Sequence, residues 1–163
     1  MCATLKTLSY LDCAAVAHLT LDPEQEQFAG SLDFVFSELR KSSHSDLEHP
    51  FSIVVRGEIV GFFVLREKAA LPEWAPPDVI TWHSLRIGDL YQGNGYGKKA
   101  FDLVARWICA NRPHISRVMF AVNARNLGAR SAFLKVGCRD TGATYCGPIG
   151  PQNILEYKIG PRL

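Results

Sequence analysis

Residues 92–98 read QGNGYGK, with glycines at positions 93, 95 and 97 and a lysine at position 98. The apolar stretch 79–87 before this segment predicts a strand, and the apolar residues of 100–108 recur at helical spacing after it. Glycines between a strand and a helix let backbone N–H groups turn toward a ligand, and the helix N-terminus adds a positive dipole end. The segment therefore predicts an anion site, of a kind suited to a pyrophosphate group.

Two common nucleotide motifs do not fit this spacing. The P-loop needs G-x-x-x-x-G-K-[ST], but Gln92 stands five residues before Gly97, and Lys99 follows Lys98. The dinucleotide fingerprint needs G-x-G-x-x-G, whereas the third glycine here comes one residue early. A tight turn before a helix is the purely structural alternative.

The composition is that of an ordinary globular protein, and we expect one domain over residues 1–163. Hydrophobic residues make up 47% and charged residues 21%, with a formal net charge of +2. This small charge predicts no nucleic acid partner, and no apolar run is long enough to predict a membrane span. The first residues lack the apolar core of a secretory signal. Five cysteines without a C-x-x-C pair predict neither a disulfide framework nor a metal site, so we expect a reduced, cytoplasmic protein without a metal.

The rest of the chain predicts a mixed α/β or α+β sheet built mainly from hairpins, with one strand–helix–strand crossover in the second half. Asp22-Pro23-Glu24 predicts a helix start, and the apolar residues after it mark one buried face. These residues are Phe28, Leu32, Val35, Phe36 and Leu39. The other predicted elements are strands at 4–9, 51–55, 59–65, 79–87 and 118–122, a helical turn at 14–17, a helix at 126–136 and two strands within 138–159.

Two separated blocks resemble motifs of the GNAT superfamily of N-acetyltransferases. Residues 92–97 match its [QR]-x-x-G-x-[GA] pyrophosphate motif, and residues 126–137, NLGARSAFLKVG, are similar to its N-x-x-A-x-x-L-Y-x-K-x-G helix. The VGF-like segment at 60–62 extends the resemblance, and residues 26–32 resemble the branch that contains bacterial spermine and spermidine acetyltransferases. The resemblance implies an α+β fold with a mostly antiparallel, splayed sheet of about six to seven strands and about four helices.

The resemblance also implies acetyl-CoA as cosubstrate and assigns roles to single residues. Backbone groups of Leu85, Arg86 and Ile87 would pair with the pantetheine arm as if it were a short extra strand. Asn126 would contact the pantetheine or the acetyl end, and Phe133 would lie near the thioester sulfur. The pyrophosphate would be held by the segment Gln92, Gly93, Asn94, Gly95, Tyr96, Gly97 and Lys98.

For catalysis, His83 is the candidate base, acting directly or through water. It lies nine residues before Gln92, and strand alternation predicts it on the same face as Leu85 and Ile87. A β-bulge before the motif, which the resemblance implies for this strand, would reverse that alternation. The alternative is a half-buried histidine that only forms hydrogen bonds within the sheet.

Phe133 stands where the family commonly has a tyrosine that protonates the leaving thiolate, and phenylalanine has no proton to donate. Tyr145 and Cys138 are possible substitutes, although buried Tyr and Cys more often only pack.

Together these features predict acetyl transfer from acetyl-CoA to a primary amine of a small molecule or a peptide, by direct nucleophilic attack of the amine on the thioester. Glu26 and Asp33 could attract a polyamine, or could belong to an ordinary solvated helix face.

Phe133 motivates an alternative, a catalytically weak or silent acyl-CoA-binding module with a regulatory role. A phosphate-ester or nucleotide binder is a third option. The sequence does not identify the acceptor, and a homodimer is one option for the assembly.

Overall fold

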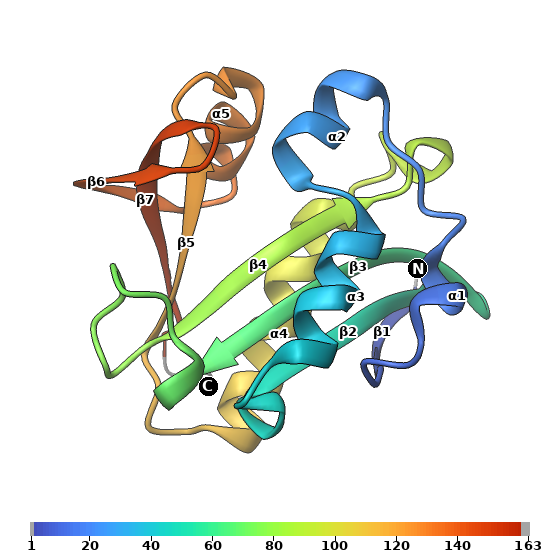
Figure 1. Ribbon diagram of the computed structural model, residues 1–163, viewed down its shortest axis with the longest axis horizontal. Helices are drawn as coiled ribbons and strands as arrows, with labels where there is room; N and C mark the ends of the chain where they lie inside the picture. Colours follow the sequence, from blue (N-terminus) through green and yellow to red (C-terminus); the bar gives the residue numbers. More distant parts are fainter. Residues whose placement is uncertain (1, 161–163) are drawn as a thin grey trace.

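The computed structural model describes residues 2–160, which form a seven-stranded sheet with helices on both faces (Figure 1). The strand order is β1-β2-β3-β4-β5-β7-β6, and every neighbouring pair is antiparallel except β4 and β5. The strands are β1 (Ala3–Thr7), β2 (Glu48–Val55), β3 (Glu58–Glu67), β4 (Ile80–Ile87), β5 (Arg117–Asn123), β6 (Arg139–Gly147) and β7 (Gly150–Lys158). This mostly antiparallel α+β sheet confirms the predicted fold class.

The helices cover the two faces of the sheet unequally. The α-helices of the described residues are α1 (Cys13–Val16), α2 (Pro23–Ala29), α3 (Leu32–Lys41), α4 (Tyr96–Asn111) and α5 (Leu127–Lys135). Helix α3 lies across one face and α4 across the other (Figure 1). The larger core packs Phe63 and Trp82 of the sheet against Phe101 of α4, while a smaller core packs Phe62 against Phe36 of α3. The two faces are thus both apolar, which explains the long apolar runs of β2 and β3.

The helix predicted to start at Asp22 is two helices in the structure. Helix α2 ends at Ala29, because Gly30 takes a positive φ of 77° and leaves the helical region. Ser31 then caps α3 by accepting a hydrogen bond from the Phe34 N–H. The predicted buried face therefore holds within α3 only, and Phe28 belongs to a separate helix that faces a cavity.

The sheet opens between β4 and β5. These strands pair only at Ile80 with Val118 and at Thr81 with Met119, and then diverge (Figure 1). On its other side β4 stays paired with β3 up to Ile87. The edge of β4 that faces β5 is consequently without a strand partner from residue 82 to residue 87 within the described chain.

A β-bulge lies in this open part of β4. Val64 of β3 pairs with His83 and Phe62 pairs with Arg86, so β4 contains one residue more than β3 over this interval. Ser84, inside the bulge, has a positive φ of 59°, an uncommon value for a residue other than glycine. The bulge reverses the alternation of side chains along the rest of the strand.

Candidate active site

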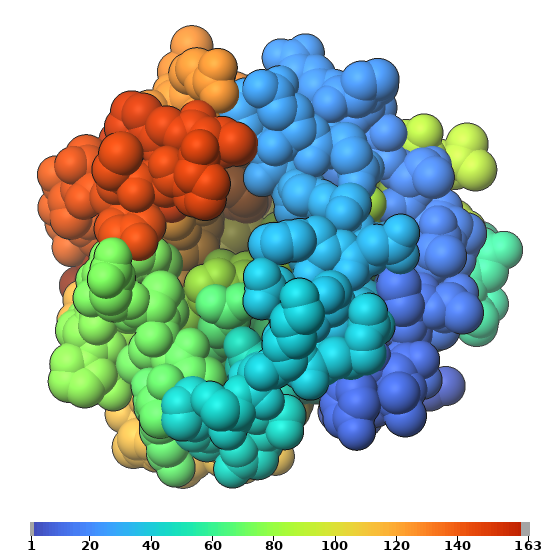
Figure 2. All heavy atoms as spheres, in the orientation of Figure 1, coloured from blue at the N-terminus to red at the C-terminus, as the bar shows by residue number. Residues whose placement is uncertain are grey.

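The divergence of β4 and β5 leads into a cavity of about 820 Å³. Its lining comes from α2, β4, the loop before α4, β5 and the loop after it, the first two turns of α4 and of α5, and β7. Figure 2 shows the molecular surface hollowed between the segment around α2 and the β6–β7 hairpin. Phe28 and Gln152 line the cavity on these two sides. A groove of this size, open at a sheet edge, can take an extended ligand.

The loop before α4 is shaped as an anion site. Gly93 and Gly95 have φ values of 83° and 81°, and Gly95 is the N-cap of α4. The Lys99 N–H donates to the Gly95 carbonyl at 3.0 Å, so the N–H groups before it in the first turn lie outside the helical ladder. A Cβ added at either of these glycines or at Gly97 would meet no atom within 4 Å. The open space above these N–H groups fits a pyrophosphate group.

Most of the residues predicted to bind the cofactor line this cavity: Leu85, Ile87, Gln92, Gly93, Gly95, Tyr96, Gly97, Asn126 and Phe133. The other three predicted residues, Arg86, Asn94 and Lys98, are not among the residues that line it. Asn94 donates its amide hydrogens to the backbone carbonyls of Tyr91 and Gln92, and Lys98 is solvent-exposed in the first turn of α4. The Arg86 side chain points to the opposite face of the sheet, so only its backbone remains available for the predicted pairing.

The Arg86 guanidinium is buried and connects β4 to the segment before α2 and to the C-terminal half of α2. It donates to the Leu19 carbonyl at 3.0 Å, to the Gly30 carbonyl, and to both carboxylate oxygens of Glu26 at 3.2 and 3.3 Å. Glu26 is therefore engaged in a structural ion pair and is not free to attract an amine. Asp33, the other acid considered for that role, accepts a hydrogen bond from Cys13 at 3.7 Å.

The bulge places His83 on the face opposite to Leu85 and Ile87, so the predicted alternation was wrong. His83 pairs with Val64, which packs in the core beneath α3, whereas Leu85 and Ile87 pack toward the core beneath α4. Its Nε2 atom lies 2.7 Å from Thr81 Oγ1. Burial, with a smaller effect from Arg66, lowers the pKa of His83 from 6.5 to about 3. The imidazole is thus neutral and weakly basic, and its role as a base stays a prediction.

Similarity to known proteins places this geometry in a family. The profile of the acetyltransferase (GNAT) family matches residues 13–138. The chain belongs to this family. It is 33% identical over 100 residues to the uncharacterized N-acetyltransferase YbbJ of Bacillus subtilis (strain 168), a match that covers 60% of this chain and 62% of that relative.

Solved structures of other acetyltransferases share the fold. The aminoglycoside acetyltransferase AAC(6')-Ib, in complex with paromomycin and acetyl-CoA, is 19% identical with a TM-score of 0.76, covering 97% of this chain and 94% of that one. A chimera of the spermidine N-acetyltransferase SpeG from Vibrio cholerae and hSSAT is 15% identical with a TM-score of 0.70, covering 96% and 95%. At these identities the likeness shows the fold alone.

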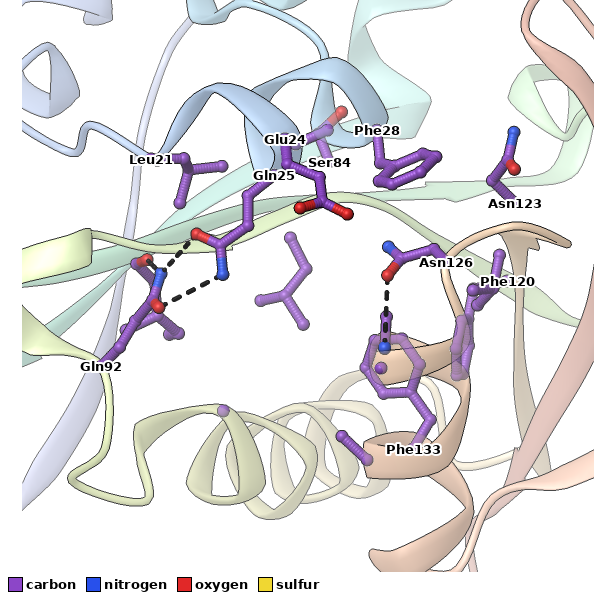
Figure 3. Close-up of a pocket in the computed structure, with 18 of the residues that line it drawn as sticks. Leu21, Glu24, Gln25, Phe28, Ser84, Gln92, Phe120, Asn123, Asn126 and Phe133 are labelled. Carbon is purple, nitrogen blue, oxygen red and sulfur yellow. Dashed lines mark hydrogen bonds between the residues drawn. The ribbon is translucent and has the colours of Figure 1, made fainter.

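The aromatic side chain at the usual GNAT tyrosine position lies at the apolar end of the cavity (Figure 3). The ring of Phe133 packs edge-on against Phe120 and Phe101, with centroids 4.9 and 5.8 Å apart. Asn126 caps α5 by accepting from the Ala129 N–H at 3.3 Å, and its amide nitrogen is turned toward the cavity (Figure 3). This end of the site can therefore exclude water from a reactive thioester while one polar group remains to orient it.

Neither side chain considered as a substitute acid lines the cavity. Tyr145 of β6 donates to Glu73, in the loop between β3 and β4, at 2.7 Å, and this bond raises the pKa of Tyr145. Cys138 is buried in the larger core, and burial raises the pKa of its thiol to about 12. Both are structural in this fold.

The sequence does not predict several residues that line the cavity on different sides. Among them are Glu24, Phe28, Ser84, Asn123, Arg125 and Gln152. The signal that could have indicated Phe28 is Gly30-Ser31, which separates α2 from the core-packed α3 and so frees this residue from the core. The other residues come together only through the sheet topology.

Within residues 2–160, no helix is long and apolar enough to cross a bilayer. No group of three His, Cys, Asp or Glu side chains in this range is placed to hold a metal ion. The five cysteines are free thiols.

Proposed function

We propose that the chain is an acetyl-CoA-dependent N-acetyltransferase that acetylates a primary amine of a small molecule or a peptide. One observation carries the proposal: the unpaired edge of β4 leads directly to the exposed N–H groups at the start of α4, along one continuous cavity. An extended arm could pair with backbone groups of residues 85–87 while its pyrophosphate reaches the segment 93–98. This arrangement suits coenzyme A better than a compact nucleotide.

The cosubstrate would supply an acetyl group already activated as a thioester. The chain's own residues would then act by positioning, since direct attack needs an oriented neutral amine and no covalent enzyme intermediate. Phe133 and Phe120 would keep water from the thioester, and Asn126 would orient it. The proton of the amine would leave through water. His83 is not among the residues that line the cavity, so as the proposed base it would act through water. Because the His83 imidazole is a weak base, we expect its contribution to the rate to be small.

The acceptor enters on the side of the cavity formed by α2, and a polyamine is one candidate. The test is thiol release from acetyl-CoA with a panel of amines: alkyl diamines, a linear polyamine, an aminoglycoside and a peptide with a free N-terminus. We expect at least one amine to stimulate release of coenzyme A and to appear as its mono-acetyl product. Binding of acetyl-CoA without stimulation by any of these amines would refute the enzymatic proposal.

A second candidate function is a silent acyl-CoA-binding module, which Phe133 favours because it cannot protonate a leaving thiolate. The same panel separates the two candidates, since a silent module would bind acetyl-CoA but release no thiol. We also propose a reducing, cytoplasmic setting, which the five free thiols support.

A further inference from the structure

The carboxylates near α2 have different environments. Asp22 accepts a hydrogen bond from the Gln25 N–H at 2.9 Å and caps the helix, and Glu26 pairs with Arg86. The Glu24 carboxylate forms neither a hydrogen bond nor an ion pair with any residue between 2 and 160. Figure 3 shows this carboxylate pointing into the cavity. It is therefore the acid of α2 that remains available for a ligand.

Hydrogen bonds of neighbouring residues fix the position of α2 and so of Glu24. Its neighbour Gln25 exchanges hydrogen bonds with Gln92 at 3.1 and 3.3 Å, which attaches α2 to the pyrophosphate loop (Figure 3). Arg86 attaches the end of α2 to β4 through Glu26 and the Gly30 carbonyl. The carboxylate thus faces the cavity from a helix that is hydrogen-bonded to β4 and to the loop that follows β4.

An aromatic ring stands beside this carboxylate. Phe28, one helical turn beyond Glu24, lines the same wall. The Arg125 guanidinium lies 5.9 Å from the centroid of its ring and donates to the Ile149 carbonyl, so the cation contact of this ring is made by the chain itself. The Glu24 carboxylate is therefore the group that favours an ammonium, and the Phe28 ring would pack against the alkyl chain of such a ligand.

We propose that Glu24 selects the acceptor by binding a protonated amine other than the one that is acetylated. A carboxylate paired with an ammonium group raises the pKa of that amine and keeps its proton in place. The attacking amine must be neutral, so an ion pair with Glu24 suits a second amine of the same molecule. The acceptor class is therefore a small molecule with at least two amines. This inference rests on the proposed acetyltransferase function.

The test compares two acceptors of equal length, an α,ω-diaminoalkane and the amino alcohol in which a hydroxyl replaces one amine. For Glu24→Gln we expect KM for the diamine to rise by about threefold to fivefold, because Glu24 is solvent-exposed and an exposed ion pair contributes at most about 1 kcal/mol. We expect kcat, and KM for the amino alcohol, to stay within about twofold. Increasing salt should raise KM for the diamine in the wild type but not in the variant. Glu38→Gln, an exposed position of α3 outside the cavity, is the matched control and should change none of these values.

A binding measurement tests the diamine site at Glu24 independently of the proposed acetyltransferase activity. Isothermal titration of the diamine into the protein loaded with coenzyme A should show binding to the wild type that Glu24→Gln weakens by about threefold to fivefold. If no amine is acetylated but this difference is found, the proposed enzymatic function fails and the site stands. Equal binding by both proteins would overturn the inference. So would an equal loss of kcat for both acceptors, because Glu24 would then act on the reacting amine.

Discussion

At the scale of single residues, the burial of His83 makes the fold sensitive to acid. The unfolded chain binds a proton at this residue with a pKa near 6.5, whereas the folded chain binds it only at about 3. Between these two pKa values the unfolded state binds more protons than the folded state. The contribution of His83 to the unfolding free energy is therefore fully present above pH 6.5 and decreases as the pH falls toward 3. The slope from one group is at most about 1.4 kcal/mol per pH unit.

We therefore expect His83→Asn to flatten the dependence of the unfolding free energy on pH between pH 7 and pH 4.5. Urea unfolding at several pH values measures this slope. His114→Asn, at an exposed position, is the matched control. Equal slopes for wild type and His83→Asn would mean that the imidazole takes up its proton as readily in the folded chain as in the unfolded one.

Phe133 offers a test of how the thiolate leaves. We expect Phe133→Tyr to raise kcat by roughly threefold to tenfold, since a phenol can protonate the thiolate, and general acid catalysis is worth about 10² or more when it is well placed. The added hydroxyl would lie at the cavity, so the unfolding free energy should change by less than about 1 kcal/mol. Steady-state kinetics with an accepted amine give the answer. An unchanged kcat, at unchanged KM for acetyl-CoA, would show that loss of the thiolate does not limit the rate.

At the scale of elements, the position of α2 depends on one arginine of β4. Removing the Arg86 guanidinium would leave Glu26 and the carbonyls of Leu19 and Gly30 without their donor. We expect Arg86→Met to lower the unfolding free energy by about 3 kcal/mol. It should also raise KM for the acceptor, because α2 carries part of the acceptor wall.

Arg130→Met is the control for this prediction, because Arg130 pairs with Asp140 at 2.8 Å near the surface. Surface pairs contribute about 0–1 kcal/mol, so this variant should unfold nearly as the wild type does. Chemical denaturation of both variants measures the difference. A loss at Arg86 no larger than that at Arg130 would contradict the proposed anchoring of α2.

The elements differ in how far the sequence predicts them. The hairpin of β2 and β3 follows from its apolar runs and from Arg56-Gly57, which take positive φ values of 52° and 79°. The start of α4 follows from the glycines of 92–98. The break at Gly30-Ser31 interrupts an apolar pattern that continues through it, so the pattern alone predicts one helix. Such local patterns predict most helices and strands, but not where one apolar pattern is divided between two helices of different direction.

The parts of the site that the sequence leaves open depend on contacts between distant residues. The bulge at Ser84 arises from the register of β4 against β3, and it reverses the face of His83. The pairing of Arg86 with Glu26 joins residues 60 positions apart. The carboxylate of Glu24 differs from that of Glu26 in having no hydrogen-bond or ion-pair partner within the described residues 2–160, a property that exists only in the folded chain.

At the scale of the whole molecule, the sheet consists of two parts joined by a narrow strip. Strands β1 to β4 and strands β5 to β7 meet through two residue pairs of β4 and β5, beside the cavity. A ligand that contacts both parts would bind the folded state alone. Acetyl-CoA at a hundredfold excess over its Kd should therefore add about 2.7 kcal/mol to the unfolding free energy.

The most direct test of the acetyl-CoA site is thermal unfolding with coenzyme A, ATP and NAD at equal concentrations, for the wild type and two glycine variants. Gly95→Ala and Gly57→Ala strain similar left-handed backbones, with φ values of 81° and 79°, but only Gly95 lies in the proposed site. We predict that coenzyme A raises Tm of the wild type more than ATP or NAD does, and that this increase is lost in Gly95→Ala and kept in Gly57→Ala. An equal increase in both variants, or a larger increase with ATP or NAD, would contradict the acetyl-CoA site.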